Sequence, residues 1–272
     1  MPPVRLTRNL RAVWRLLRLL SHLVKGLLKI AFLFPRYSQA QKDQAVQIWA
    51  LALLRRLGIT LRVLGQAPLT GPVLLAANHI SWLDIIVMHA ARHCRFISKD
   101  DIARWPVVGT LATAAGTLYI QRESRRDALR VVHQMAECLQ NDEVLAVFPE
   151  GTTGDGTTVL PFHANLFQAA IAANAPVMPI GLKFVDARSK ESSFAPCYVG
   201  DDTLIGSVWR TLCADPIEAV IHFGPSQTAQ GRDRRSWAAE VREAVVALRA
   251  KPGAPDRNRT CITPLGGESS IH

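Results

Sequence analysis

A histidine and an aspartate stand five residues apart where an apolar run ends. The run Pro72–Ala77 has the continuous apolar character of a buried strand, and Asn78 and His79 follow it directly. Asp84 comes at the start of the next helical stretch, where a carboxylate suits the positive end of the helix dipole. This carboxylate can accept a hydrogen bond from one imidazole nitrogen and leave the other free as a general base. On this pattern alone, the simpler interpretation is favoured, in which Asp84 is a helix-start residue and His79 is a loop hydrogen-bond donor.

A second polar segment follows another buried strand, Glu143–Phe148. It reads Phe148-Pro-Glu-Gly-Thr-Thr-Gly-Asp-Gly156, and its glycines and hydroxyls leave backbone N–H groups open to an anion or a polar headgroup. A plain glycine-rich turn is the alternative. No third glycine completes a dinucleotide-binding fingerprint, and the sequence contains no P-loop, G-x-S-x-G or H-E-x-x-H motif. These absences argue against a P-loop nucleotidase, a serine hydrolase and a zinc protease.

Together the two segments resemble the glycerolipid acyltransferases. Asn78-His79 with Asp84 matches their N-H-x-x-x-x-D signature, and the segment from Phe148 to Thr152 matches their F-P-E-G-T block. Two further blocks stand in the usual order, at 116–122 and 177–180. Residues typical of the 1-acylglycerol-3-phosphate acyltransferases also stand at Lys99, Trp105, Pro106 and Gly109. The resemblance spans about residues 60–225.

The resemblance implies direct transfer of a fatty acyl group from a thioester, on acyl carrier protein or coenzyme A, to a lysolipid hydroxyl. The implied acceptor is the sn-2 hydroxyl of 1-acylglycerol-3-phosphate (lysophosphatidate), which gives phosphatidate, and no metal or redox cofactor is implied. His79 would take the hydroxyl proton while Asp84 orients the imidazole, without a covalent acyl-enzyme. The implied substrate-binding residues are Asn78, Arg122, Glu150, Gly151, Thr152 and Thr153. The implied acyl-chain or interface residues are Lys99, Trp105 and Pro179.

One departure from the family pattern concerns the acceptor headgroup. Members that act on lysophosphatidate usually continue the third block with Arg or Ser, where this chain has Thr153, and His163 and Asn165 replace a usual Lys and Gly. A missing guanidinium removes a bidentate phosphate partner worth about 1.5–3 kcal/mol. Thr153 followed by Gly-Asp-Gly is similar to the branch that acylates lyso-ornithine lipids, whose headgroup is zwitterionic. Because Arg122 is present, lysophosphatidate is the first prediction and a lyso-ornithine lipid is the alternative.

Strands that alternate with helices must position these segments. Apolar runs predict strands at 72–77, 94–98, 116–120, 143–148, 176–182 and 218–223, and helical periodicity predicts helices at 82–92, 123–139, 159–173 and 232–249. This order predicts an α/β fold, similar to glycerol-3-phosphate acyltransferases, with a mostly parallel sheet covered by helices. The predicted organisation is an N-terminal helical hairpin over 1–58, an α/β acyltransferase domain over 59–251 and a flexible tail over 252–272.

The N-terminal segment carries most of the net charge. The formal charge of the chain is +10, and residues 1–36 contain eight Lys or Arg and no acid. From Leu10 to Phe34 the basic and histidine positions lie on one stripe of a helix: Arg11, Arg15, Arg18, His22, Lys25 and Lys29. A charge or histidine in every turn argues against a spanning helix, and the segment lacks the uninterrupted core and cleavage site of a signal peptide.

We therefore predict an amphipathic two-helix hairpin, with a second helix over Gln39–Leu57 that ends at Gly58. The hairpin would lie in the membrane interface, with a set of basic residues among anionic headgroups: Arg11, Arg15, Arg18, Lys25 and Lys29. The alternative is an ordinary amphipathic helix that packs on its own domain.

The five cysteines are widely spaced and form no C-x-x-C pair, which predicts reduced thiols. Together with the basic helix and the implied donors, they predict a peripheral or monotopic protein on the cytoplasmic face of the inner membrane. A non-catalytic peripheral lipid-binding protein is the alternative to an enzyme. A nucleic-acid partner is disfavoured, because the charge lies on a leucine-rich helix without an aromatic recognition face.

Overall fold

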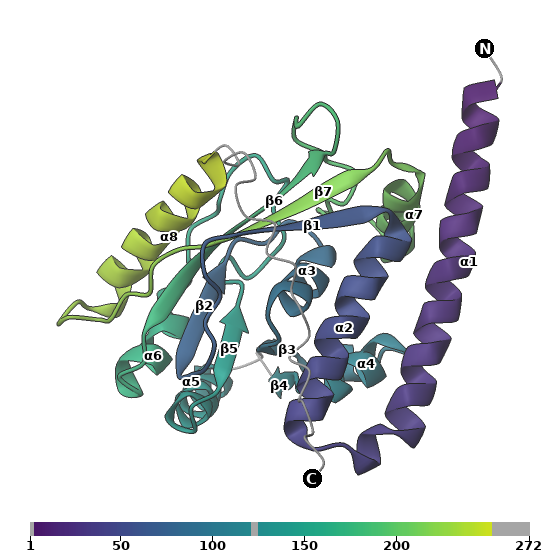
Figure 1. The fold of residues 1–272 in the computed structure, drawn as a ribbon. Helices are drawn as coiled ribbons and strands as arrows, with labels where there is room; N and C mark the ends of the chain where they lie inside the picture. The colour runs from purple at the N-terminus through teal and green to yellow at the C-terminus, as the bar shows by residue number, and fades with distance from the viewer. Residues whose placement is uncertain (1–2, 121–124, 252–272) are drawn as a thin grey trace, which may run out of the picture.

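A seven-stranded sheet forms the centre of the protein (Figure 1). The computed structural model describes residues 3–120 and 125–251. The strands are β1 (Ile59–Leu64), β2 (Val73–Ala77), β3 (Arg95–Lys99), β4 (Leu118–Ile120), β5 (Val144–Val147), β6 (Val177–Asp186) and β7 (Ile217–Phe223). Their spatial order is β1-β7-β6-β2-β5-β3-β4; β6 and β7 pair antiparallel, and the other neighbours pair parallel.

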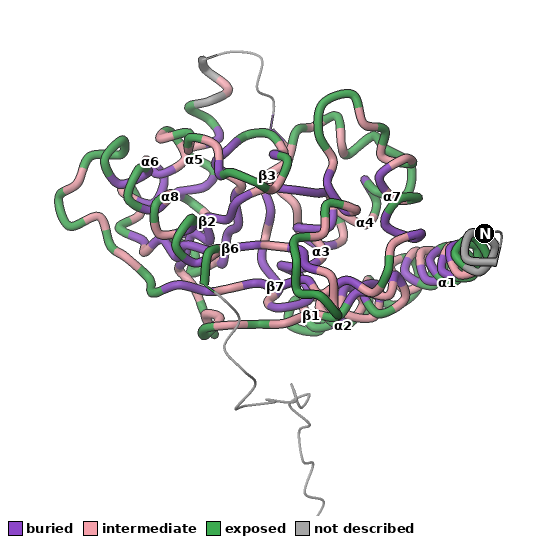
Figure 2. Tube along the Cα trace, turned by 90° about the horizontal axis from the view of Figure 1, so that it is seen from above, coloured by how far each residue is buried: buried purple, intermediate pink, exposed green. Residues whose placement is uncertain are grey.

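Helices cover both faces of this sheet (Figure 1). The helices are α1 (Pro3–Phe32), α2 (Gln39–Leu57), α3 (Leu83–Ala91), α4 (Val108–Ala114), α5 (Arg125–Gln140), α6 (Phe167–Ala172), α7 (Leu204–Cys213) and α8 (Arg234–Ala250). Helices α2, α3 and α7 share one apolar core with the sheet, and α5, α6 and α8 share the other. Strands β2 and β5 are buried along their whole length at the centre of the sheet, and Figure 2 shows the buried trace of β2. This explains their continuous apolar sequence and confirms the predicted α/β fold.

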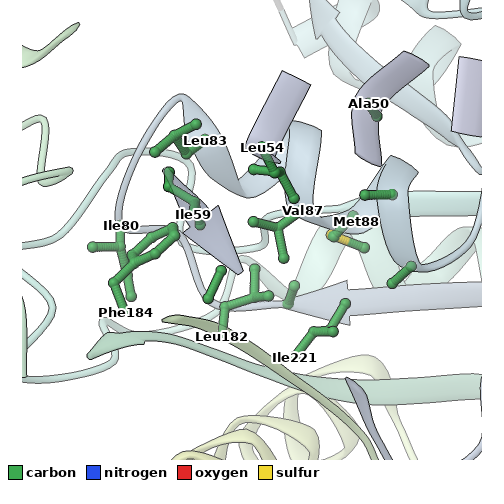
Figure 3. Close-up of a cluster of buried hydrophobic side chains, with 14 of the residues drawn as sticks. Ala50, Leu54, Ile59, Ile80, Leu83, Val87, Met88, Leu182, Phe184 and Ile221 are labelled. Atoms are coloured by element: carbon green, nitrogen blue, oxygen red, sulfur yellow. The ribbon is translucent and has the colours of Figure 1, made fainter. Parts of the chain in front are cut away.

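The core beneath α3 fixes the loop that follows β2. Ile80 and Leu83 lie on that loop and at the start of α3, and they belong to a cluster with Leu54, Val87 and Phe184 (Figure 3). Buried side chains in such clusters pack at nearly crystalline density, so their backbone has little freedom. The loop between β2 and α3 is therefore held at both ends by core residues.

Three elements were not predicted from the sequence, and a fourth was predicted too long. Strand β1 and helices α4 and α7 are the unpredicted elements. The predicted helix over 159–173 is wrong in its first half: a short 3-10 turn spans Ala164–Leu166, and α6 begins only at Phe167. In place of a helix, the backbone around Leu160 bonds to side chains: its N–H donates to Glu150, and its carbonyl accepts from Arg242.

Helix α1 lies against α2 and α7. Some basic side chains of its stripe contact the protein, and others are exposed to solvent. Arg15 is buried, and its guanidinium donates to the carbonyls of Leu212 and Ala214 at 2.9 and 2.8 Å, at the end of α7. Arg18 and Lys25 are exposed. The expectation that the whole stripe faces headgroups is therefore wrong for Arg15, whose charge holds α1 against the domain.

The outward face of α1 is apolar instead. The exposed large side chains on this face are Leu10, Val13, Trp14, Leu17, Leu20, Val24, Leu28 and Phe32. Helices α1 and α2 approach closely at Gly26, where a Cβ atom would lie 2.6 Å from the Trp49 indole nitrogen. Helix α2 ends at Gly58, as predicted, and Gly58 adopts the left-handed conformation. Among the helices of the described ranges, none combines the length and apolar character needed to cross a membrane.

Candidate active site

The imidazole of His79 and the carboxylate of Asp84 form a short hydrogen-bonded pair at the carboxyl end of β2. His79 Nδ1 lies 2.8 Å from Asp84 Oδ2, and Asp84 is completely buried in the first turn of α3. The same oxygen accepts from the backbone N–H groups of Ile80 and Ser81 at 2.6 and 2.8 Å. Because three donors converge on it, this oxygen is suited to carry a negative charge without water. Such a carboxylate fixes the Nδ1–H tautomer and leaves Nε2 to accept a proton.

The second motif is joined to the first through Glu150, which follows β5. One carboxylate oxygen of Glu150 accepts from the N–H of His79 at 2.6 Å, and the other accepts from the N–H of Leu160 at 2.6 Å. Burial raises the pKa of Glu150, although these two hydrogen bonds and the nearby Arg249 oppose that shift. Both oxygens are thus occupied by backbone groups. The structure places Glu150, predicted to contact the headgroup, where it positions the backbone of His79.

Asn78 also has a different place from the one predicted. Its side chain is 1% exposed, its amide nitrogen donates to the carbonyl of Leu182 at 3.1 Å, and its amide oxygen accepts from the N–H of Leu182 at 2.7 Å. These bonds tie the end of β2 to β6. Asn78 therefore holds the sheet beneath His79 instead of facing a substrate.

Replacing Asn78 with alanine is expected to destabilise the fold. It leaves the buried N–H of Leu182 without the amide acceptor, and buried unsatisfied groups cost about 1–3 kcal/mol each. We expect the free energy of unfolding in urea to fall by about 2–4 kcal/mol, whereas Asn165→Ala, at an exposed position, changes it by about 0.5 kcal/mol or less. Unchanged stability with a raised acceptor KM would instead return Asn78 to the substrate site.

The segment around Tyr198, which carries no sequence motif, is hydrogen-bonded to both motifs. The Thr153 hydroxyl donates to the carbonyl of Tyr198, and the N–H of Tyr198 donates to the carbonyl of Ile80 at 3.2 Å. Thr153 is thus already engaged by protein, whereas Thr152 beside it is exposed. Gly151 has φ +72, and a Cβ atom there would lie 2.8 Å from the His163 ring.

The remaining predicted residues lie on β3, just beyond it, and on β6. Lys99 is exposed at the end of β3, and Trp105 is 42% exposed beyond it. Pro179 is buried inside β6, opposite Ala76, so the structure does not place it at an interface. Arg122 falls outside the described residues. Within the part of the chain that the structure describes, no three His, Cys, Asp or Glu side chains are grouped as metal ligands.

Comparison with known proteins gives one family. An acyltransferase family model matches residues 58–183. The 1-acyl-sn-glycerol-3-phosphate acyltransferase of Neisseria gonorrhoeae is 36% identical over 209 residues, which cover 76% of this chain and 81% of that protein. The lyso-ornithine lipid O-acyltransferase of Pseudomonas aeruginosa is 33% identical over 257 residues, which cover 92% of this chain and 98% of that protein.

A solved structure has the same fold. The crystal structure of the 1-acyl-sn-glycerophosphate acyltransferase of Thermotoga maritima aligns with a TM-score of 0.67 at 16% identity. The alignment covers 92% of this chain and all of that one. The likeness therefore extends over nearly the whole architecture of strands and covering helices.

Proposed function

Because this chain belongs to the glycerolipid acyltransferase family, we propose that it moves a fatty acyl group from a thioester to a lysolipid hydroxyl at His79. The observation that carries the assignment of the site is the 2.8 Å contact between His79 Nδ1 and Asp84 Oδ2. A general base must be oriented and must be stabilised once it is protonated, and a buried carboxylate does both. The pair stands at the carboxyl ends of the central strands, where open α/β sheets bind their ligands.

The residues support a direct transfer. As the acceptor oxygen forms its bond to the thioester carbonyl carbon, its proton passes to His79 Nε2, and Asp84 stabilises the imidazolium that results. The carbon–sulfur bond then breaks, the leaving sulfur takes the proton from the imidazolium, and a free thiol and a new ester are released. His79 returns to its neutral form and Asp84 stays ionised throughout. Glu150 holds the backbone N–H of His79 in place during both steps.

For the acceptor we propose lysophosphatidate, with Arg122 as the cation that meets its phosphate. The Neisseria relative carries that name, and it supports this choice. A lyso-ornithine lipid is the second candidate. It is favoured by the Pseudomonas relative and by Thr153, which stands where Arg or Ser is usual and whose hydroxyl is bonded to the carbonyl of Tyr198.

The test is a thiol-release assay with purified protein and one acyl thioester, run separately with each acceptor. We expect turnover with lysophosphatidate and a fall of about 10–100-fold in kcat/KM for Arg122→Ala, the equivalent of one charge-assisted phosphate contact. Turnover only with the lyso-ornithine lipid would establish the second candidate. Lysolipid binding without release of thiol from any donor would contradict both and favour a non-catalytic lipid-binding protein.

We further propose that α1 attaches the protein to the membrane surface through its apolar face. Trp14 is 61% exposed and Leu17 is 55% exposed, and such a continuous apolar face on a helix is typical of an interaction surface. Arg18 and Lys25 are also exposed on α1, and they can meet anionic headgroups while Arg15 holds the helix to the domain. This arrangement would bring the site to the surface where a lysolipid acceptor resides.

The double variant Trp14→Ser with Leu17→Ser is expected to lose membrane binding. Each buried apolar side chain contributes about 1.5–3 kcal/mol, so the affinity for anionic vesicles in co-sedimentation should weaken at least about tenfold. Because the lost contacts are apolar, this loss should be similar at low and at high salt. The matched control is Leu129→Ser with Val246→Ser, two exposed apolar residues on helices of the opposite face. Equal loss in both double variants, or none in either, would contradict attachment through α1.

A further inference from the structure

We propose that Phe148 is a positioning residue of the transfer reaction, whose ring face holds the His79 imidazole and stabilises the imidazolium formed on it. The two rings lie 4.0 Å apart between centroids and 8° from parallel. Phe148 comes directly after β5, and His79 comes two residues after β2, the strand beside it. This inference rests on the proposed function, because it concerns the protonated state of the general base.

Two contacts constrain the imidazole from different directions. Asp84 holds the edge of the ring at Nδ1, and this hydrogen bond alone leaves the ring able to tilt about the bond. Phe148 covers one face, so the ring plane cannot tilt without losing the stack. A catalytic group held within about 10–20° of its productive orientation keeps its reactive atom, here Nε2, directed at the substrate.

The stack also distinguishes the two protonation states of His79. The face of a phenyl ring carries partial negative charge, and it attracts a cation within about 6 Å of its centroid. A neutral imidazole gains less from this face than an imidazolium does. Phe148 therefore interacts more strongly after the proton has moved to His79, and only interactions that strengthen toward the transition state accelerate the chemical step.

Other rings support Phe148 from behind. Phe96 of β3 stacks on Phe148, with 5.5 Å between centroids and 20° between planes, and Phe96 is buried. The ring of His89 from α3 meets Phe96 edge-on, with 5.1 Å between centroids. Burial lowers the pKa of His89 to about 3, so this ring is neutral at physiological pH and places no competing positive charge behind the stack. Phe148 is thus fixed by neighbours that do not oppose a charge on His79.

The column of rings ends at the N-terminal hairpin. His89 stacks on His93 with 5.2 Å between centroids, and Nε2 of His93 lies 3.2 Å from a carboxylate oxygen of Asp43 on α2. Every step from α2 to His79 is a direct ring or hydrogen-bond contact. One continuous set of packed side chains therefore connects the hairpin to the catalytic pair.

The test is site-specific replacement of Phe148 by phenylalanines carrying one, three and five fluorines. Fluorine withdraws charge from the ring face while the ring keeps almost the same shape. We expect kcat to fall stepwise, by roughly 3- to 30-fold for the pentafluoro ring, with unchanged KM for donor and acceptor. The same series at Phe167, which is buried among rings in the other core, should leave kcat unchanged.

Two further variants separate charge stabilisation from packing. Phe148→Tyr keeps an aromatic face and should retain most activity, whereas Phe148→Leu should fall at least as far as the pentafluoro ring. A flat fluorine series, together with a fall for Phe148→Leu, would make Phe148 a packing residue only and would overturn this inference while the proposed function stands. A wild-type protein that releases no thiol with any lysolipid would overturn the proposed function, and this inference with it.

Discussion

Replacing His79 with alanine is expected to lower kcat for acyl transfer by about 10²–10⁴-fold, the range that a general base contributes. The loss follows because Nε2 is the atom proposed to take the hydroxyl proton, and Asp84 is too deeply buried to reach a substrate in its place. The measurement is steady-state thiol release with saturating donor and acceptor. The apolar face of α1, which is proposed to bind the membrane, lies on a different element, so co-sedimentation with vesicles should be unaffected.

The matched control is His133→Ala, which removes an exposed imidazole from α5. We expect this variant to retain the full rate, and both variants to give the circular dichroism spectrum of the wild-type protein. A His79→Ala protein that keeps more than about a tenth of the activity would show that this imidazole is not the base.

The second large effect is expected for Asp84→Asn, which keeps the shape of the side chain and removes its charge. The amide oxygen can still accept from the N–H groups of Ile80 and Ser81, so the loop stays in place. The imidazolium on His79 then lacks a counter-charge in a half-buried site, and we expect kcat to fall by about 10³-fold while KM changes little. Steady-state kinetics as a function of each substrate separate the two constants.

Asp201→Asn serves as the control, since it removes a carboxylate from an exposed turn. It should leave kcat within about twofold of the wild type. If Asp84→Asn also stays within about threefold, the carboxylate only shapes the loop, and the imidazolium must be stabilised by other groups.

The fold was largely predictable because its central strands are buried on both faces. β2 and β5 read as continuous apolar runs, and helices α5 and α8 carry clear periodicity. β1 lies at the edge of the sheet, and the alternation of apolar and polar residues from Ile59 to Leu64 is the local signal of such a strand. Helix α7 likewise has a detectable start at Thr203, whose side chain accepts from the N–H of Gly206.

The members of the candidate site were predictable from spacing, but their orientations were not. His79 and Asp84 are close in sequence, so local geometry decides that they meet. Asn78 turns inward because it bonds to Leu182. That partner is 104 residues away, so no local pattern in the sequence reveals it. Arg15 is similar: helical periodicity places it on a stripe, but only the fold brings the carbonyls at the end of α7 to that stripe.

The most direct test of the central claim is rapid-quench measurement of thiol release from a radiolabelled acyl thioester, with and without lysolipid. Direct transfer at His79 predicts that thiol appears only when the acceptor is present, in a one-to-one ratio with the new ester, and that no label remains on the protein. A burst of thiol without acceptor, with label bound covalently to the chain, would contradict direct transfer by a general base and require an acyl-enzyme.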